Sequence, residues 1–195
     1  MVVYKLIVLF VITLLITGCS SGAPASSLPS QTSLNQAAVP PSSLSISIAA
    51  FQYGQPIPQK FTCQGENVSP AMAWSGVPAG TKSLALVLED PDAPGLTFIH
   101  WLIYNLPPTL SGLPEKVAAG DQVPGIGTQG PGSSASAGYT GPCPPSGKAH
   151  HYFFNLYALD LDPSLPTGLN AADLQRQMTG HILGQAQWVG TYQRQ

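Results

Sequence analysis

The apolar residues of this chain either alternate with polar ones or form short continuous runs, which is the pattern of β-strands. Residues 45–48 read Ser-Ile-Ser-Ile and predict a first strand. The run 83–89 is almost entirely apolar and is followed by Asp-Pro-Asp-Ala-Pro-Gly. Because the run is apolar at nearly every position, we expect a strand that is buried on both faces. The two prolines prevent the strand from continuing.

Two further runs, 98–106 and 150–159, predict strands that begin beside loops and carry histidines. Because side chains alternate along a strand, we expect His150 and Tyr152 to share one face and His151 to point to the other. In the same way, we expect His100 to share a face with Leu102 and Tyr104, and Trp101 to share the opposite face with Ile103 and Asn105.

The rest of the pattern is weaker. A short strand near 60–62 and a last strand over 186–192 are predicted, with a turn over 76–80. Residues 171–178 predict a helix, with Asn170 as N-cap and Gly180 near its end. The segment 111–138 is rich in Gly, Ser, Ala and Pro without periodicity, so we expect a long loop. The fold class is therefore mainly β with one or two short helices.

The N-terminus reads as an export signal. Lys5 precedes an apolar run over 6–16, and Ile-Thr-Gly-Cys follows at 16–19. This ending resembles a bacterial lipobox, which implies a signal peptide over 1–18 and acylation of Cys19, for example with palmitate. The alternative is an ordinary signal peptide with a coincidental cysteine. An acylated Cys19 would hold the protein on a membrane of the cell envelope, and Ser20 hints at the outer membrane where there is one.

Two regions follow the signal. Residues 19–43 contain mainly Ser, Pro, Ala and Gln without charge, and predict a flexible tether. Residues 44–195 have the length of one domain. Charged residues make up only 8% of the chain and the formal net charge is −2, with no basic stripe, so we expect no nucleic-acid partner.

The cysteines leave two possibilities open. If Cys19 carries lipid, Cys63 and Cys143 remain as a pair for which a disulfide is chemically permitted in an exported protein. Sequence alone does not show that they lie within bridging distance. Otherwise Cys143, between two prolines, is a free thiol with His150 among its neighbours, although no local signature of a thiol enzyme surrounds it. No CxxC spacing indicates zinc.

The richest candidate site is the loop 138–149, Gly-Tyr-Thr-Gly-Pro-Cys-Pro-Pro-Ser-Gly-Lys-Ala, and the start of the next strand. A rigid Gly/Pro loop presents backbone N–H groups, and His150 and Tyr152 add an imidazole and a phenol. These donors suit a small anion such as a phosphate monoester. Imidazoles near neutral pH would bind phosphate better as the pH falls.

Asp90 and Asp92 flank Pro91 at the end of a buried strand. Either one carboxylate enters a pocket and orients a histidine or a ligand, or both accept hydrogen bonds from loop N–H groups in an Asx turn. His100 alone would read as a core residue, but it lies at a strand start like His150. We expect no metal site and no cofactor, because HxxxH and HxH patterns are absent. No GxSxG turn supports a serine hydrolase.

Several motifs together resemble the phosphatidylethanolamine-binding protein family, and more closely its bacterial Raf-kinase-inhibitor-like branch. They are Leu-Glu-Asp-Pro-Asp-Ala-Pro at 88–94, His-Trp at 100–101 with Asn-Leu-Pro at 105–107, Gly-Tyr-Thr-Gly-Pro-Cys-Pro-Pro at 138–145 and His-His-Tyr at 150–152. Residues 62–70, 74–83 and 189–192 are similar to that branch as well.

The resemblance implies one β-sandwich-like domain with a large central antiparallel sheet, a smaller second sheet and a few helices. It also implies a small pocket for phosphate-type anions, including a phospholipid head group. By position, the ligand-binding residues would be Asp90, Asp92, His100, Tyr139, Gly141, Cys143, Pro144, His150 and Tyr152. The chain departs from the family at Cys143, which is Gly in eukaryotic members, and over 127–137, which is unusually rich in Ser and Gly.

Three hypotheses for function follow. The first is a non-enzymatic, lipid-anchored protein that binds a phosphate-bearing ligand. The second is an inhibitor or regulator of an envelope protease or another protein partner, with the pocket loop as contact surface. The third is a hydrolase using Asp90 with His100 or His150, which ranks last because nothing in the sequence supplies an activated nucleophile.

Overall fold

A six-stranded antiparallel sheet forms the centre of the computed structural model, which describes residues 43–194. Its strand order is β6-β7-β4-β3-β8-β9. The strands are β3 (Ser83–Asp90), β4 (Phe98–Leu106), β6 (Gln122–Val123), β7 (Gly127–Gly130), β8 (His150–Leu159) and β9 (Ile182–Tyr192). The three long central strands are those in which the sequence carries the strongest apolar runs.

A smaller antiparallel sheet covers one face of the large sheet. It contains β1 (Ser45–Ser47), β2 (Met72–Ser75) and β5 (Gly112–Leu113), in the order β1-β2-β5. Buried side chains from both sheets pack between them, among them Ile46, Trp74, Leu86, Trp101 and Phe154. This packing is the main hydrophobic core and gives the two-layer arrangement of a sandwich.

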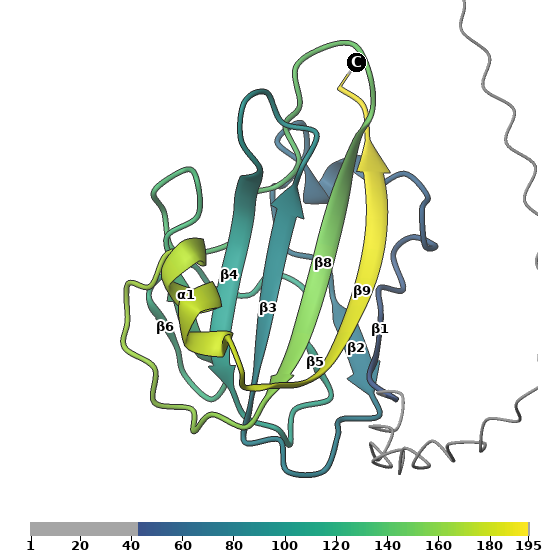
Figure 1. Cartoon of the computed structure of the whole chain (residues 1–195). Coiled ribbons are helices and arrows are strands. Elements are labelled where there is room, and N and C mark those ends of the chain that lie inside the picture. The colour runs from purple at the N-terminus through teal and green to yellow at the C-terminus, as the bar shows by residue number, and fades with distance from the viewer. Residues whose placement is uncertain (1–42, 195) are drawn as a thin grey trace, which may run out of the picture. The chain divides into compact units, whose positions relative to one another are not determined.

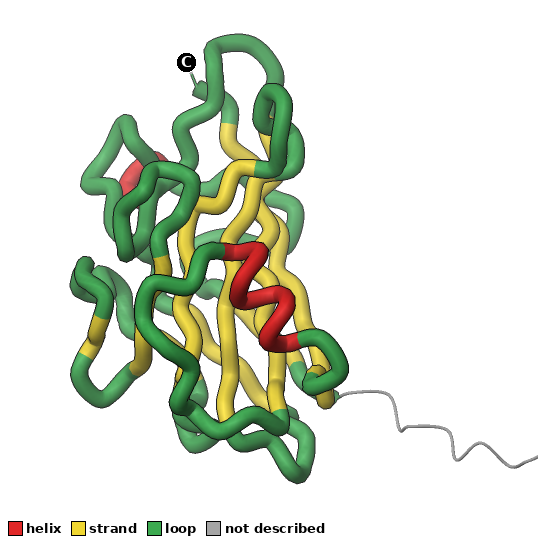
Figure 2. The backbone as a smooth tube through the Cα atoms, turned by 60° about the vertical axis from the view of Figure 1, so that its left-hand side comes forward, coloured by secondary structure: helices red, strands yellow, loops and turns green. Residues whose placement is uncertain are grey.

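The helix α1 (Ala171–Met178) packs on the other face of the large sheet, as Figures 1 and 2 show. Its buried residues Leu174 and Met178 form a second core with Val87 of β3 and Leu102 of β4. The Asn170 side chain accepts a hydrogen bond from the Asp173 N–H at 3.0 Å, so the predicted N-cap is confirmed. A mainly β fold with two antiparallel sheets and one helix is therefore confirmed.

Three predicted details of secondary structure are wrong. Residues Gln59–Phe61 form a 3₁₀ helix, η1, instead of a strand. The expected long loop over 111–138 contains β5, β6 and β7. Strand β2 was not predicted, and β9 begins four residues before the predicted strand. The strands that were missed are only two to four residues long, which is too short to show a periodic pattern of apolar residues. They are stabilised by pairing with distant segments.

The predicted face of His100 is also wrong, because β4 contains a β-bulge. Leu88 of β3 pairs with Trp101, whereas the next residue, Glu89, pairs with Ile99. His100 is the extra residue between these two pairs, and its side chain turns away from the core that contains Leu102 and Tyr104 and lies against Tyr152. A second register shift near Asn105, whose φ is 56°, separates Asn105 from Trp101 and Ile103 in the same way.

The predicted signal peptide, the predicted acylation site Cys19 and most of the predicted tether lie outside the described residues. Within residues 43–194, no helix is long and apolar enough to span a membrane. The predictions for the N-terminal segment therefore stay predictions.

Candidate functional site

A small pocket lies where β3 ends and where β4 and β8 begin, at the upper end of the sheet in Figure 1. Its volume is about 140 Å³, well below the 300–1,000 Å³ typical of sites for drug-sized ligands. The lining residues are Asp90, Ala93, Pro94, Phe98, His100, Thr140, Gly141, Cys143, Pro144, Pro145 and His150. The site therefore has room for a head group or a small ion rather than for a large molecule.

A buried carboxylate–imidazole pair forms one wall. Asp90 ends β3 and is 3% exposed, and His150 begins β8 and is 8% exposed. The Nδ1 of His150 lies 2.7 Å from Oδ2 of Asp90. Because the carboxylate accepts, His150 carries a proton on Nδ1, and its Nε2 is left for another partner. The other oxygen of Asp90 accepts from the N–H of Asp92 at 2.9 Å, so the Asx turn and the oriented histidine occur together.

His100 forms a second wall and is held on three sides. Its Nδ1 lies 2.8 Å from the carbonyl oxygen of Thr140, so this nitrogen donates. Its ring packs against Phe98 at 4.6 Å and against Tyr152 at 5.2 Å between ring centroids. Burial lowers the pKa of His100 below its ordinary value of 6.5, and the hydrogen bond to Thr140 opposes this shift only in part. The ring is therefore neutral at pH 7.

The Gly/Pro loop forms the third wall, but it offers fewer donors than predicted. The N–H of Thr140 donates to the carbonyl of His100 at 2.9 Å, and the N–H of Gly141 donates to Oδ1 of Asn67 at 2.8 Å. Prolines 142, 144 and 145 have no N–H. The N–H groups of Thr140 and Gly141 thus hold the loop in place, so these two lining residues do not offer free N–H groups to a ligand.

A disulfide anchors this loop to the segment after η1. The sulfur atoms of Cys63 and Cys143 are 2.06 Å apart, and their Cα atoms are 5.4 Å apart. In addition, the N–H of Cys63 donates to the carbonyl of Pro142 at 3.1 Å. A free thiol at Cys143, the basis of the thiol-nucleophile alternative, is therefore not available in this structure.

Close approach of the backbone also requires a glycine at 141. A Cβ atom there would lie 2.5 Å from the carbonyl oxygen of Phe61 and 2.9 Å from the Cα of Thr62. These contacts are too short to be relieved by a side-chain movement. Any larger residue would push the loop away from the pocket.

Six of the nine predicted ligand residues line the pocket, namely Asp90, His100, Gly141, Cys143, Pro144 and His150. Three do not. Asp92 points outward and binds the ring and the N–H of His151, at 2.6 and 2.9 Å. Tyr139 donates its hydroxyl to the carbonyl of Phe61 at 2.6 Å.

Tyr152 is fully buried beneath His100 and supports that ring from below. Burial raises the pKa of its hydroxyl, and the nearby Asp90 carboxylate adds to the rise. Tyr139 and Tyr152 therefore position the walls instead of lining them. Conversely, Phe98 and Thr140 line the pocket although the motifs did not indicate them, and Asn67 holds the loop. Phe98 lies two residues before His100 in the same strand, so alternation along that strand could have placed the two rings on one face.

None of the described residues that line the pocket is a Lys or an Arg. Among residues 43–194, no group of three or more His, Cys, Asp or Glu side chains has the arrangement of a metal site. The chemistry of the site is therefore that of two imidazoles, one buried carboxylate and a largely apolar rim.

This two-sheet β fold is shared by a known class of proteins. The family model of the phosphatidylethanolamine-binding proteins matches residues 47–193. The chain belongs to the phosphatidylethanolamine-binding protein family.

Individual relatives agree with this assignment. A UPF0098 protein of Methanothermobacter thermautotrophicus is 48% identical over 145 residues, which are 74% of this chain and 95% of the relative. LppC of Mycobacterium tuberculosis, a protein named as a lipoprotein, is 36% identical over 184 residues, 90% of this chain and 89% of the relative.

Two solved structures have the same fold. The phosphatidylethanolamine-binding protein homologue CT736 of Chlamydia trachomatis superposes with a TM-score of 0.72 at 39% identity, covering 79% of this chain and 99% of that protein. YbcL of E. coli superposes with a TM-score of 0.70 at 29% identity, covering 78% and 99%.

The disulfide leads to a first prediction. Replacing both Cys63 and Cys143 with Ser removes a link between residues separated by 80 positions, so the free energy of unfolding should fall by about 2–4 kcal/mol. Urea denaturation measures this loss. Thiol alkylation followed by mass spectrometry of the unfolded wild-type protein checks the bond itself, and labelling of both cysteines without prior reduction would contradict it.

The pKa of His100 leads to a second prediction. The folded state holds this proton less tightly than the unfolded state, so stability should fall as the pH decreases below 6.5. In His100→Asn, whose amide can still donate to Thr140, the slope of unfolding free energy against pH between 5 and 6.5 should be shallower. Ring NMR titration gives the pKa directly, and a value above 6.5 would refute the assignment.

Proposed function

We propose that this protein is a non-enzymatic binding protein whose Asp90–His100–His150 pocket takes a phosphate-bearing ligand of head-group size. The observation that carries the proposal is the placement of two nearly buried imidazoles, each donating through Nδ1 to a fixed oxygen, around one small cavity. In both rings this leaves Nε2 as the group available to a ligand. Membership of the phosphatidylethanolamine-binding protein family supports the same ligand class.

Protonation decides what these rings can bind. A neutral ring whose Nδ1 carries the proton has a lone pair on Nε2, which can accept a hydrogen bond from the P–OH of a phosphate monoanion. A protonated ring donates from Nε2 to a phosphate oxygen and adds a positive charge. Because the lining that the structure describes contains no Lys or Arg, these two states of the histidines must supply most of the attraction.

The Asp90 carboxylate makes the site selective. It accepts the hydrogen bond from Nδ1 of His150 at 2.7 Å, but its negative charge repels an anion unless at least one ring is protonated. Binding of phosphate should therefore be accompanied by proton uptake and should strengthen as the pH falls. The carboxylate also favours ligands that carry an amine beside the phosphate, such as the ethanolamine phosphate head group.

The rim of the pocket suits a ligand that continues outside. Pro94, Phe98, Pro144 and Pro145 surround the polar centre with apolar surface, and Pro94 and Pro145 are exposed. A head group can enter while the rest of a lipid or substituted phosphate stays in contact with this rim. The rigid prolines lose little conformational entropy when the ligand binds.

The proposal includes attachment to the cell envelope through an acylated Cys19. The Ile-Thr-Gly-Cys motif supports it, as does the similarity over 184 residues to the relative named as a lipoprotein. Attachment would keep the pocket within reach of phospholipid head groups.

Titration with phosphoethanolamine tests the ligand class. We expect saturable shifts of the His100 and His150 ring signals, a rise of the pKa of His100 on binding, and an affinity about tenfold higher at pH 6 than at pH 7.5. Inorganic phosphate and ethanolamine, titrated separately, show which part of the ligand is recognised.

A matched pair of variants locates the binding. His150→Asn keeps a donor for Asp90 but removes Nε2, and it should abolish the response. His181→Asn is the control, because His181 makes an equivalent 2.7 Å contact with Asp160 outside the pocket. Unchanged binding in His150→Asn, or no ring response in the wild type, would overturn the proposal.

Attachment is tested separately by expressing the full chain in a bacterial host and isolating its membranes. We expect the protein in the membrane fraction, with the mass of an acylated N-terminal Cys19, and release of Cys19→Ala into the soluble fraction. An unmodified thiol at Cys19 in the membrane fraction would rule out acylation but would leave the pocket assignment untouched.

A further inference from the structure

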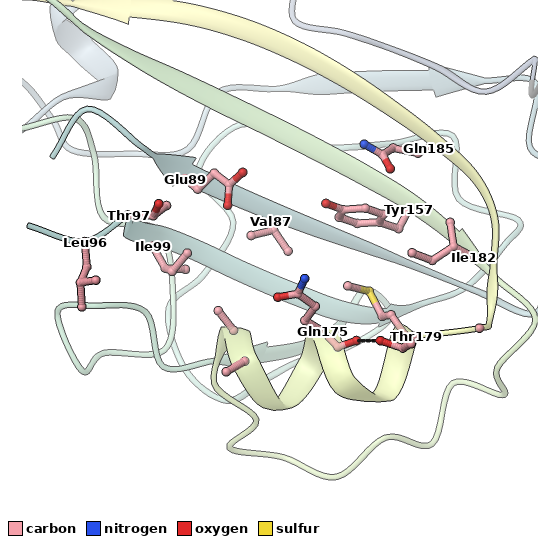
Figure 3. A pocket seen from close by; sticks show the side chains of 14 residues that line it. Val87, Glu89, Leu96, Thr97, Ile99, Tyr157, Gln175, Thr179, Ile182 and Gln185 are labelled. Carbon is pink, nitrogen blue, oxygen red and sulfur yellow. Dashed lines mark hydrogen bonds between the residues drawn. The ribbon is translucent and has the colours of Figure 1, made fainter. Parts of the chain in front are cut away.

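A second and larger cavity lies on the opposite face of the large sheet, between that sheet and α1. Its volume is about 810 Å³, within the range of sites for organic ligands. It exists because α1 packs on β3 and β4 through Leu174 and Met178 and leaves part of this face uncovered (Figure 3). The proposed phosphate pocket shares no lining residue with it.

Apolar side chains form much of the floor and rim of this groove, and Thr97, Gln175, Thr179 and Gln185 add uncharged polar groups. Val87, Ile99 and Met178 contribute to the floor, and the ring of Tyr157 lies beside them. Two rim residues are exposed to an extent that is unusual for their size, Leu96 at 85% and Ile182 at 44%. Together with Tyr53 they are the only large exposed hydrophobic side chains among the described residues, so two of three lie at this groove.

One charged group lies among the lining residues of the groove. Glu89 is the only Asp, Glu, Lys, Arg or His among the lining residues, and its carboxylate points into the groove near Val87 (Figure 3). The amide of Asn155 donates to one of its oxygens at 2.9 Å, and the amide of Gln187 donates to Asn155 at 2.7 Å. These two hydrogen bonds orient the Glu89 carboxylate. Among the described residues, only one of its two oxygens accepts a side-chain hydrogen bond.

The hydroxyl of Tyr157 lies on the same side of the groove. Burial raises the pKa of Tyr157, and the negative charge of Glu89 adds to the rise. The aromatic ring also offers a face to a cation. The groove thus combines apolar surface with an aromatic ring and a carboxylate that has one oxygen free for a further hydrogen bond. None of the described residues that line it is a Lys or an Arg.

From this arrangement we propose that the groove is a binding site for an organic cation, an ammonium or guanidinium group carried on an apolar stem. The cation contacts Glu89 and the ring of Tyr157, and the stem packs on Val87, Ile99 and Met178. The Glu89 carboxylate is partly desolvated already, so a cation that hydrogen-bonds to its second oxygen is attracted more strongly than in water. The proposal is independent of the phosphate pocket.

The same chemistry can come from a small amine or from a Lys or Arg side chain of a peptide. The probes are therefore n-octylammonium and a short peptide with one Lys between Leu residues. Their controls are octanol and octanoate for the amine, and the peptide with Lys replaced by Gln. Binding of the peptide alone would assign the site to a protein partner.

Methionine methyl groups provide a local readout. In the full chain labelled with ¹³C-methyl methionine, the Met178 signal reports on the groove, and Met72 in the opposite core is the internal control. We expect saturable shifts of Met178 with n-octylammonium or the Lys peptide and none of Met72. Affinity should be about tenfold lower in Glu89→Gln, because Gln keeps the acceptor for Asn155 but removes the charge.

Glu115→Gln is the matched control, since it removes a carboxylate paired with Lys60 outside the groove. It should bind as the wild type does. A native amide spectrum and unchanged phosphoethanolamine binding in Glu89→Gln show that the variant is folded.

Three results would overturn the proposal: a Met178 response that is equal for octanol and octylammonium, undiminished affinity in Glu89→Gln, or no response to either cationic probe. A concentration-dependent dimer in sedimentation that shifts Met178 without any probe would also contradict it, because a second copy would then cover the groove.

Discussion

Burial of β3 on both faces is the constraint on which the rest of this structure depends. Leu84, Leu86 and Leu88 enter the core between the sheets, and Ala85 and Val87 enter the core beneath α1. A strand that is apolar on both sides needs a layer on each face, since either face left open would expose a continuous hydrophobic surface. The small sheet and the helix supply these layers.

The same alternation distributes charge at the end of the strand. Asp90 and Glu89 are neighbours in sequence but lie on opposite faces, so one carboxylate enters the small pocket and the other enters the groove beneath α1. Each is oriented by a residue of β8, His150 in the first case and Asn155 in the second. The register between β3 and β8 therefore sets the polar chemistry of both cavities.

Rigidity around the pocket comes from long-range links in the loop. The disulfide and the bond from Gly141 to Asn67 hold the Gly/Pro loop against the region that follows η1, and Thr140 holds it against β4. In return, the loop carbonyl at Thr140 fixes the tautomer of His100. The N–H groups of Thr140 and Gly141 thus fix the position of the loop, which leaves the imidazoles as the main candidate groups for recognition of a ligand.

The local pattern of apolar and polar residues was sufficient to predict the long elements. It predicted the boundaries of β4, β8 and α1 and nearly those of β3, because their apolar residues repeat with the period of the element they form. Most of the pocket-lining residues were also predicted, through motifs in three separate segments. The strands β5, β6 and β7 were missed because they exist only through pairing with distant partners.

What the sequence by itself determined is the set of groups available: the central strands, the pair Asp90 and His150 at strand ends, and a loop rich in Gly and Pro. Only the tertiary structure decided in which direction these side chains point. The bulge at His100 turns its ring to the pocket side, Tyr152 becomes a support beneath that ring, and the groove at Glu89 opens where α1 stops covering the sheet. The alternation of side chains between two faces follows from the strand to which they belong. Register shifts, loop hydrogen bonds and the burial of a sheet face beneath another element arise instead from contacts between segments that are far apart in the chain.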